Sequence, residues 1–255
     1  MRIALGVEYD GRSYFGWQSQ PHVVTVQDVL QEAVGRIADA SISIFAAGRT
    51  DAGVHALEQV AHFDTDAVRP LTAWVRGVNA ALPDSISVRW AHVVPEEFHA
   101  RFSAEARSYR YFLINRPMRP AVCAGLAGWF HLPLDIEAMQ DAAACLIGER
   151  DFSAFRAAEC QASSPVKCMH RIDIRREGEM VVFDFTASAF LHHMVRNLVG
   201  SLVHVGKGKC APSWLAAVLE GRERSKAAPT FMPDGLYLRR IHYDEKWGLP
   251  QSEER

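Results

Sequence analysis

Apolar and polar residues follow two regular patterns in the first half of the chain. From Ile3 to Tyr9 the apolar residues occupy every second position, which is typical of a half-buried strand. From Thr25 to Ile37 they recur at helical spacing, with Thr25 at the start and the acid Asp28 in the first turn. In this half we predict strands at residues 3–9, 41–47, 59–63 and 86–92, and helices at 25–37 and 71–82.

The second half repeats this alternation of strands and helices. The polar turn at 176–179 separates two strand-like runs. Here we predict strands at 108–114, 169–175, 180–186 and 235–243, and helices at 136–147, 190–205 and 213–219. Two halves with a similar order of elements indicate a duplicated α+β unit. We therefore expect an N-terminal α+β domain at residues 1–104 and a C-terminal α+β domain at residues 105–255.

Composition indicates a folded protein rather than a disordered or membrane chain. Apolar residues make up 49 % of the 255 residues and charged residues 23 %, enough apolar material for a sizeable core. No stretch approaches the roughly 20 consecutive apolar residues that a membrane span needs. The first ten residues contain acids and read as a strand, which does not fit a secretory signal peptide. We therefore expect a cytoplasmic location.

The cysteines do not form a metal or disulfide framework. Their number, five, is odd, and none of them forms a C-x-x-C pair. No H-E-x-x-H or phosphate-binding P-loop pattern occurs either. The sequence thus predicts ordinary reduced thiols and no metal site.

Basic residues are concentrated although the chain as a whole is slightly acidic. The net charge of -2 does not by itself indicate nucleic-acid binding. Residues 106–120, however, contain four arginines and no acid, and residues 185–219 also lack acids. Two such tracts indicate a local anion-binding surface, with a solvated basic face as the alternative.

The segment from Gly48 to His55 is the strongest candidate for chemistry. An apolar run leads into a turn in which Arg49, Thr50 and Asp51 stand between two glycines. Glycine permits a close approach of ligand to backbone, so Asp51 can face a cleft. An Asx turn that caps the next element explains the same residues equally well. The local pattern leaves both interpretations open.

The whole segment, GRTDAGVHA, resembles the signature of the tRNA pseudouridine synthase A family. Further resemblances occur in the family's order and cover nearly the whole chain. They are YFGWQSQ at 14–20, TVQ at 25–27, FHARFSA at 98–104, RSYRY at 107–111, FLHHMVRN at 190–197 and GLYL at 235–238. The loop at 225–234 is less typical of the family, which leaves its local contacts open.

The resemblance implies a fold and an activity. The fold would be α+β, with two ferredoxin-like halves that share a central antiparallel sheet and an active-site cleft between them. The enzyme would be an isomerase that converts uridine to pseudouridine at positions 38, 39 and 40 of the tRNA anticodon stem-loop. It would act as a homodimer and need no cofactor or metal. The target uridine has to leave the stack, which costs a few kcal/mol.

The resemblance also assigns Asp51 as the catalytic aspartate. A carboxylate can serve as a covalent nucleophile. Attack on the sugar C1′, removal of a sugar proton and addition to C6 of the base all remain open. Tyr109 matches the active-site tyrosine, whose ring would stack on the flipped base. A strand aromatic that faces the core is the alternative, and we prefer that alternative for Tyr111.

Arg196 has an argument from its own surroundings. Its neighbours from Leu191 to Val199 are mostly apolar, so its guanidinium is expected to be partly buried. A buried charge without a partner costs several kcal/mol, and no acid lies in this segment. In the family the matching arginine pairs with the catalytic aspartate. We therefore predict an Asp51–Arg196 ion pair that keeps Asp51 ionised, with a surface arginine as the alternative.

The resemblance further implies a set of RNA contacts. Arg49 would contact phosphate or fill the space of the flipped nucleotide, and Leu236 would wall the uracil pocket. A solvent-facing arginine and core packing are the respective alternatives. We expect His55, His192 and His193 to be structural or to face RNA. The remaining predicted RNA-binding residues are Phe98, His99, Ala100, Arg101, Phe102, Arg107, Arg110, Glu159, Cys160, Gln161, Ala162 and Ser163.

Two other classes of function are compatible with parts of the pattern. A non-catalytic RNA-binding protein could use the same scaffold, and substitution of Asp51 would leave its function intact. A glycoside or nucleoside hydrolase would also use a carboxylate nucleophile, but it usually needs a second carboxylate as general acid. The nearest acid after Asp51 in the sequence is Glu58. The resemblance favours the synthase.

Overall fold

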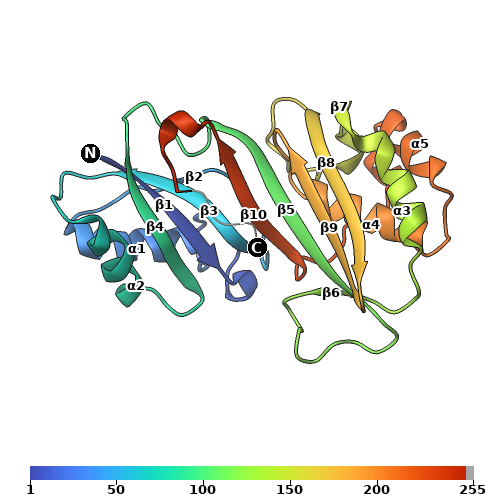
Figure 1. Cartoon of the computed structure of the whole chain (residues 1–255), viewed down its shortest axis with the longest axis horizontal. Helices are drawn as coiled ribbons and strands as arrows, with labels where there is room; N and C mark the ends of the chain where they lie inside the picture. The colour runs from blue at the N-terminus through green and yellow to red at the C-terminus, as the bar shows by residue number, and fades with distance from the viewer. Residues whose placement is uncertain (251–255) are drawn as a thin grey trace. The chain divides into compact units, whose positions relative to one another are not determined.

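The computed structural model describes residues 1–250 and has an α+β fold with a large, mostly antiparallel sheet (Figure 1). The chain divides into two units. Unit 1 comprises Met1–Glu105 and the residues from Leu238 onward, and unit 2 comprises Ala106–Tyr237. The predicted α+β class with an antiparallel sheet is confirmed. In the described residues no helix is both long and apolar enough to cross a membrane.

Unit 1 is built on β1 (Arg2–Tyr9), which lies where the alternation predicts a strand, but Ile3–Val7 are all buried, so the strand is not half-buried as expected. It pairs antiparallel with β3 (His55–Asp64) on one side and with β4 (Ile86–Val94) on the other. The strand order is β4-β1-β3-β10, with β10 at Leu236–Tyr243. Helices α1 (Val26–Ala38) and α2 (Val78–Ala81) pack against each other, and one π-helical turn at Ala73–Gly77 precedes α2.

Helix α1 forms where the sequence predicts it. Thr25 caps its start, accepting a hydrogen bond from the backbone N–H of Asp28 at 3.3 Å. Leu30 and Val34 on its apolar stripe are fully buried. Asp39 ends the helix in the left-handed conformation.

The predicted strand at 41–47 is wrong for most of its length, because only β2 (Phe45–Ala46) is a strand. Two glutamines of α1 explain the difference. Gln31 Oε1 accepts the backbone N–H of Ile44 at 3.0 Å, and Gln27 Nε2 donates to its carbonyl at 3.0 Å. Ile44 therefore satisfies its backbone with side chains instead of a neighbouring strand.

Residues 238–250 belong to unit 1, whereas they were expected in the second domain at 105–255. Aromatic contacts account for this assignment. The Phe98 ring lies 5.3 Å from that of Tyr243 and 5.4 Å from that of Trp247, measured between centroids. The Tyr243 hydroxyl also donates to the Ala100 carbonyl at 2.6 Å.

Unit 2 contains a second run of antiparallel strands in the order β5-β9-β8-β7. Residues of one face of β5, β8 and β9, among them Tyr111, Ile174 and Phe183, are buried. Helices α3 and α4 pack against each other, and α5 packs on both (Figure 1). The bounds are β5 Ala104–Asn115, β6 Gly128–Phe130, α3 Ile136–Ala143, β7 Gly148–Asp151, β8 Val166–Glu177, β9 Met180–Ala187, α4 Met194–Gly206 and α5 Ser213–Gly221.

Helix α4 starts at Met194, four residues later than the predicted start at Phe190. His193 has a φ of 60°, in the left-handed region, which interrupts the helical path before Met194. The two short strands β6 and β7 were not predicted from the sequence. Strand β6 pairs in parallel with the end of β5, and β7 pairs with the start of β8.

Candidate active site

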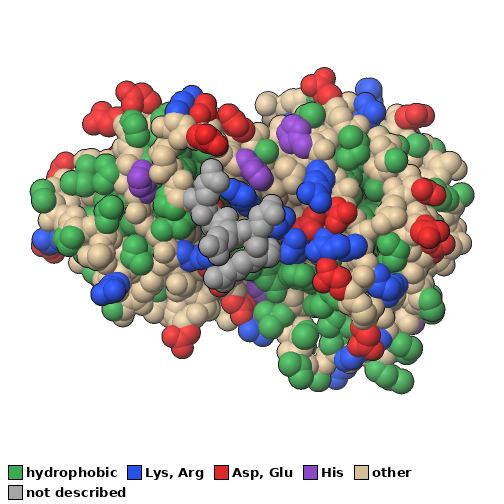
Figure 2. Space-filling view, viewed as in Figure 1, with side chains coloured by type: hydrophobic (Ala, Val, Ile, Leu, Met, Phe, Trp, Pro, Cys, Tyr) green, Lys and Arg blue, Asp and Glu red, His purple; other side chains and the backbone are tan. Residues whose placement is uncertain are grey.

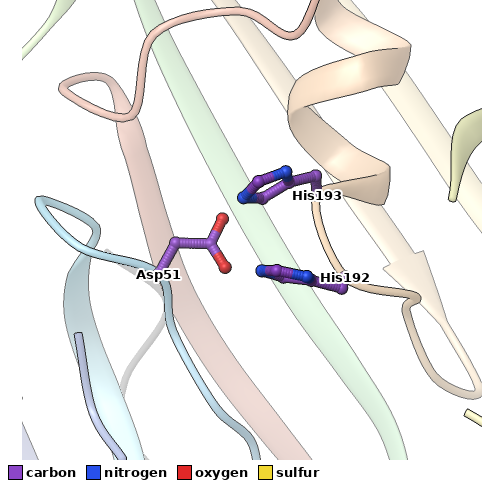
Figure 3. Close-up of side chains that lie close together, drawn as sticks. All are labelled: Asp51, His192 and His193. Atoms are coloured by element: carbon purple, nitrogen blue, oxygen red, sulfur yellow. The ribbon is translucent and has the colours of Figure 1, made fainter. Parts of the chain in front are cut away.

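Asp51 lies on the loop between β2 and β3 (Figure 3). Hydrogen bonds fix the residues before it. The hydroxyls of Tyr9 and Thr50 are joined by a buried hydrogen bond of 2.8 Å. The backbone N–H of Trp17 donates to the Thr50 carbonyl at 3.0 Å. The Asp51 carbonyl accepts the backbone N–H of Val54 at 3.1 Å, which closes a turn. Thr50 is buried while Asp51 is half-buried, so the loop presents the carboxylate from a fixed base.

Gly16 permits a neighbouring segment to approach this loop. Its φ is +84°, and a Cβ placed there would lie 2.5 Å from the Thr50 carbonyl oxygen. A side chain would therefore be strained in conformation and would clash with the backbone next to Asp51.

Gln59 on β3 holds the loop of Asp51 by a hydrogen bond. Its Nε2 donates to the Gly48 carbonyl at 2.7 Å, and its side chain is fully buried. Its Oε1 is buried without a hydrogen-bond partner among the described residues. Sequence reasoning missed Gln59. The signal in the sequence was a polar residue at the start of the strand predicted at residues 59–63.

Tyr109 lies on β5 and is 8 % exposed, with its ring edge-on to Phe190 at 5.0 Å between centroids. Tyr111, two residues further along the same face, is fully buried. Its hydroxyl donates to the Met232 carbonyl at 2.9 Å, and burial holds its pKa well above the usual value. Tyr111 is thus a core residue, as expected, whereas Tyr109 keeps some exposed surface.

Arg196 lies in the first turn of α4, between the buried residues Val195 and Asn197. Its side chain is half-buried, as predicted, and its Nε donates to the Phe231 carbonyl at 2.9 Å. This bond fixes one edge of the guanidinium. A bidentate carboxylate or phosphate partner would therefore bind through Nη1 and Nη2. His192 and His193 lie on the segment that leads into the same helix (Figure 3).

The predicted RNA-binding segment from Phe98 to Phe102 divides into core and surface residues. Phe98 and Ala100 are fully buried, so their side chains pack in unit 1. Phe102 is 76 % exposed, with the Arg101 guanidinium over its ring and the His99 ring 4.3 Å away. Only His99, Arg101 and Phe102 of this segment offer side-chain surface to a ligand.

Phe45 extends this surface, although sequence reasoning did not select it. It is 52 % exposed, and its ring stacks on His62 at 5.4 Å and lies 5.8 Å from His99. The signal in the sequence was a large apolar residue in the short segment at 41–47, which also contains polar residues. Phe45, His99 and Phe102 together form an exposed aromatic group of the kind that stacks on nucleobases.

The two arginines predicted to bind RNA on β5, Arg107 and Arg110, donate to different groups. Arg110 forms a bidentate pair with Asp184, at 2.8 and 3.0 Å, and Arg175 binds the same carboxylate at 2.7 Å. Figure 2 shows basic and acidic side chains side by side on this strand face. Arg107 instead donates to the Ser188 carbonyl at 3.0 Å. Arg49 is exposed, and Leu236, at the start of β10, is buried.

In the predicted segment from Glu159 to Ser163 the side chains of Glu159, Gln161 and Ser163 are exposed, while Cys160 is 9 % exposed. Its Sγ accepts the backbone N–H of His192 at 3.4 Å. Burial raises the pKa of this thiol, but hydrogen bonds from two backbone N–H groups and the charge of Arg156 more than offset burial and hold it below its usual value.

The comparisons with known proteins place this fold and these motifs in one class of enzyme. The model of a family described as tRNA pseudouridine synthase matches residues 6–103 and 142–244. The chain therefore belongs to the tRNA pseudouridine synthase family. This confirms the predicted enzyme class, an isomerase that forms pseudouridine in tRNA.

Individual relatives match along the full length. The tRNA pseudouridine synthase A of Dechloromonas aromatica is 60 % identical over 100 % of this chain and 97 % of its own length. That of Methylobacillus flagellatus is 59 % identical over 100 % and 98 %. That of Herminiimonas arsenicoxydans is 59 % identical over 99 % and 93 %.

The first prediction concerns Gln59. The variant Gln59→Leu removes the donor to the Gly48 carbonyl, so the free energy of unfolding should fall by about 1–3 kcal/mol. Urea denaturation measures this change. Gln20→Leu is the matched control, because Gln20 makes a similar 3.1 Å bond to the Phe15 carbonyl at an exposed site. A loss no larger than that of the control would contradict the role of Gln59.

The second prediction concerns His62, whose Nδ1 accepts the backbone N–H of Ala100 at 3.2 Å. Burial, and then the charges of His99 and Arg2, lower its pKa to about 4. In the unfolded chain the value is about 6.5, so between these values the unfolded state binds the extra proton. Stability should therefore fall by about 1–2 kcal/mol as the pH drops from 7 to 5.

His62→Asn isolates this contribution, because an amide oxygen can accept the same hydrogen bond without titrating. Urea denaturation at pH 5 and 7 should show a smaller pH dependence for the variant than for the wild type. Equal slopes would exclude His62 as the cause.

Proposed function

We propose that the chain converts uridine to pseudouridine at positions 38, 39 and 40 of the tRNA anticodon stem-loop, with Asp51 as the nucleophile. The observation that carries the proposal is the loop of Asp51. The Thr50 hydroxyl and the Gly48 carbonyl before this residue are hydrogen-bonded by Tyr9 and Gln59, while Asp51 itself stands at a half-buried position. Fixed placement of a reacting group is what a nucleophile requires.

The chemistry places definite demands on the site. The bond from N1 of uracil to C1′ breaks, the base turns, and C5 bonds to C1′; the proton leaves C5 and N1 gains one. The reaction is an isomerisation, so it consumes no oxidant, reductant or energy source. Asp51 acts at C1′, on a sugar proton or at C6 of the base, and Tyr109 stacks on the flipped uracil.

Arg196 completes the proposed catalytic set. We propose that its Nη1 and Nη2 bind the Asp51 carboxylate, since Nε is committed to the Phe231 carbonyl. Arginine provides such a fork for a carboxylate, and the pairing favours the ionised acid. Leu236 is proposed to wall the uracil pocket.

RNA binding is proposed for two groups of residues. The exposed aromatic group of Phe45, His99 and Phe102, with Arg101, would take unstacked bases and nearby phosphates. Arg49, Arg107, Arg110 and the segment from 159 to 163 would contact the RNA backbone. On the basis of the family resemblance, we also propose that the protein is a homodimer and is located in the cytoplasm.

The third prediction tests the nucleophile. Asp51→Asn keeps the shape of the side chain but removes its charge, so turnover should fall at least about 1,000-fold. Unmodified tRNA transcripts are incubated with protein alone, and pseudouridine is mapped by carbodiimide labelling and primer extension. Asp66→Asn, at an exposed loop position of the same unit, should act like the wild type.

Two outcomes of this experiment would refute separate parts of the proposal. Full activity of Asp51→Asn would remove Asp51 as nucleophile. If the wild type forms pseudouridine only outside positions 38 to 40, the proposed position in the tRNA is refuted, but the enzyme class is not.

The fourth prediction concerns Arg196. Arg196→Met should lower kcat about 100-fold, the effect of losing one well-placed charged donor, while the Kd for tRNA stays within about threefold. Single-turnover kinetics and filter binding measure the two quantities. Arg150→Met, at an exposed arginine of unit 2, is the control. A loss of affinity without a loss of kcat would make Arg196 a binding residue only.

A further inference from the structure

The loop that follows α5 is joined to the start of α4 at Arg196 itself. The Arg196 carbonyl accepts the backbone N–H of Phe231 at 3.2 Å, and its Nε donates to the Phe231 carbonyl at 2.9 Å. The position of Phe231 therefore determines where the guanidinium lies. This loop lies in the segment at 225–234 whose local contacts the sequence left open.

Asn197 is the centre of the network that holds this loop. Its side chain is fully buried. Its Oδ1 accepts hydrogen bonds from Thr230 Oγ1 at 2.7 Å and from Arg224 Nη2 at 3.0 Å, and its Nδ2 donates to the Phe155 carbonyl at 2.8 Å. An amide buried and bonded in this way fixes its partners, because each broken bond leaves an unsatisfied polar group.

Thr230 and Arg224 extend the network within the loop. Arg224 donates to Thr230 Oγ1 at 3.0 Å and to the Ala228 carbonyl at 2.9 Å. Thr230 immediately precedes Phe231, so its bond to Asn197 fixes the residue beside the Arg196 contact. No carboxylate takes part in these bonds. The position of the loop therefore depends on the direction of hydrogen bonds and not on ion pairing.

The surface of α4 also allows the loop at 228–231 to pack closely against it. Gly200 lies one turn after Arg196, and a Cβ there would lie 2.3 Å from the Pro229 carbonyl oxygen. The backbone N–H of Ala228 donates to Ser201 Oγ at 3.3 Å. The loop thus lies against α4 from residue 228 to residue 231.

We infer that Asn197 and Thr230 are positioning residues for Arg196, which hold the Phe231 carbonyl against its Nε and thereby orient its fork. The inference rests on the proposed role of Arg196 in turnover. It adds two residues that touch neither substrate nor Asp51 in the proposed mechanism, and it gives the loop at 224–231 a function.

The fifth prediction tests this with Thr230→Val, which keeps the shape of the side chain but cannot donate to Asn197. We expect kcat for tRNA to fall about tenfold, with KM and the Kd for tRNA within about twofold, because only the orientation of Arg196 changes. Thr230→Ser restores the hydroxyl and should retain at least half of the wild-type kcat. Thermal unfolding of each variant is followed to show that the protein is folded at the assay temperature.

Thr65→Val is the matched control, since Thr65 is a buried threonine of unit 1 whose Oγ1 accepts the backbone N–H of Ala67 at 3.1 Å. It should lose stability but not kcat. Thr230→Val is also made in the Arg196→Met background, where it should cause no further loss. An unchanged kcat in Thr230→Val, or an equal tenfold loss in the Arg196→Met background, would overturn the inference.

The same series separates this inference from the proposed function. If Arg196→Met keeps the full rate, the catalytic role of Arg196 fails first. If Arg196→Met is slow and Thr230→Val is fast, that role stands and only the positioning by Thr230 fails.

Discussion

The hydrogen bonds around the loop of Asp51 are the constraint on which unit 1 depends. If Asp51 is the nucleophile, as we propose, its loop needs other side chains to hold the residues around it. Here Tyr9 from β1 bonds the Thr50 hydroxyl, and Gln59 from β3 bonds the Gly48 carbonyl. The neighbouring strands β1 and β3 of unit 1 therefore also hold the residues of the loop just before Asp51.

Unit 2 meets the same constraint in a different way. Arg196 lies near the beginning of a helix whose neighbouring side chains are apolar, where a long cation could adopt many rotamers. The Phe231 carbonyl accepts a hydrogen bond from Nε and so fixes one edge of the guanidinium. Asn197 then fixes the loop that carries this carbonyl, through three side-chain hydrogen bonds to Thr230, Arg224 and the Phe155 carbonyl. The rigid, buried amide of Asn197 thus orders the flexible side chain of Arg196 through this loop.

Much of the fold was predictable from local pattern, and the exceptions share a cause. Alternation located β1, and helical spacing with a capping threonine located α1. The strand at 41–47 was wrong because glutamines of α1 take the backbone groups of Ile44, a contact between distant residues. Gln59 was missed for the same reason. The sequence pattern also could not show that Phe98 is buried while Phe102 of the same motif is exposed.

Basic tracts illustrate the limit of counting charges along a sequence. In the tract at 106–120, Arg110 is neutralised by Asp184 and Arg116 pairs with Glu179, two acids more than 60 residues away. Arg107 donates to the Ser188 carbonyl. A phosphate therefore has to compete with a carboxylate at Arg110 and at Arg116. The tract therefore contributes to RNA attraction less than its four arginines suggest, and the net charge of -2 is compatible with a tRNA substrate.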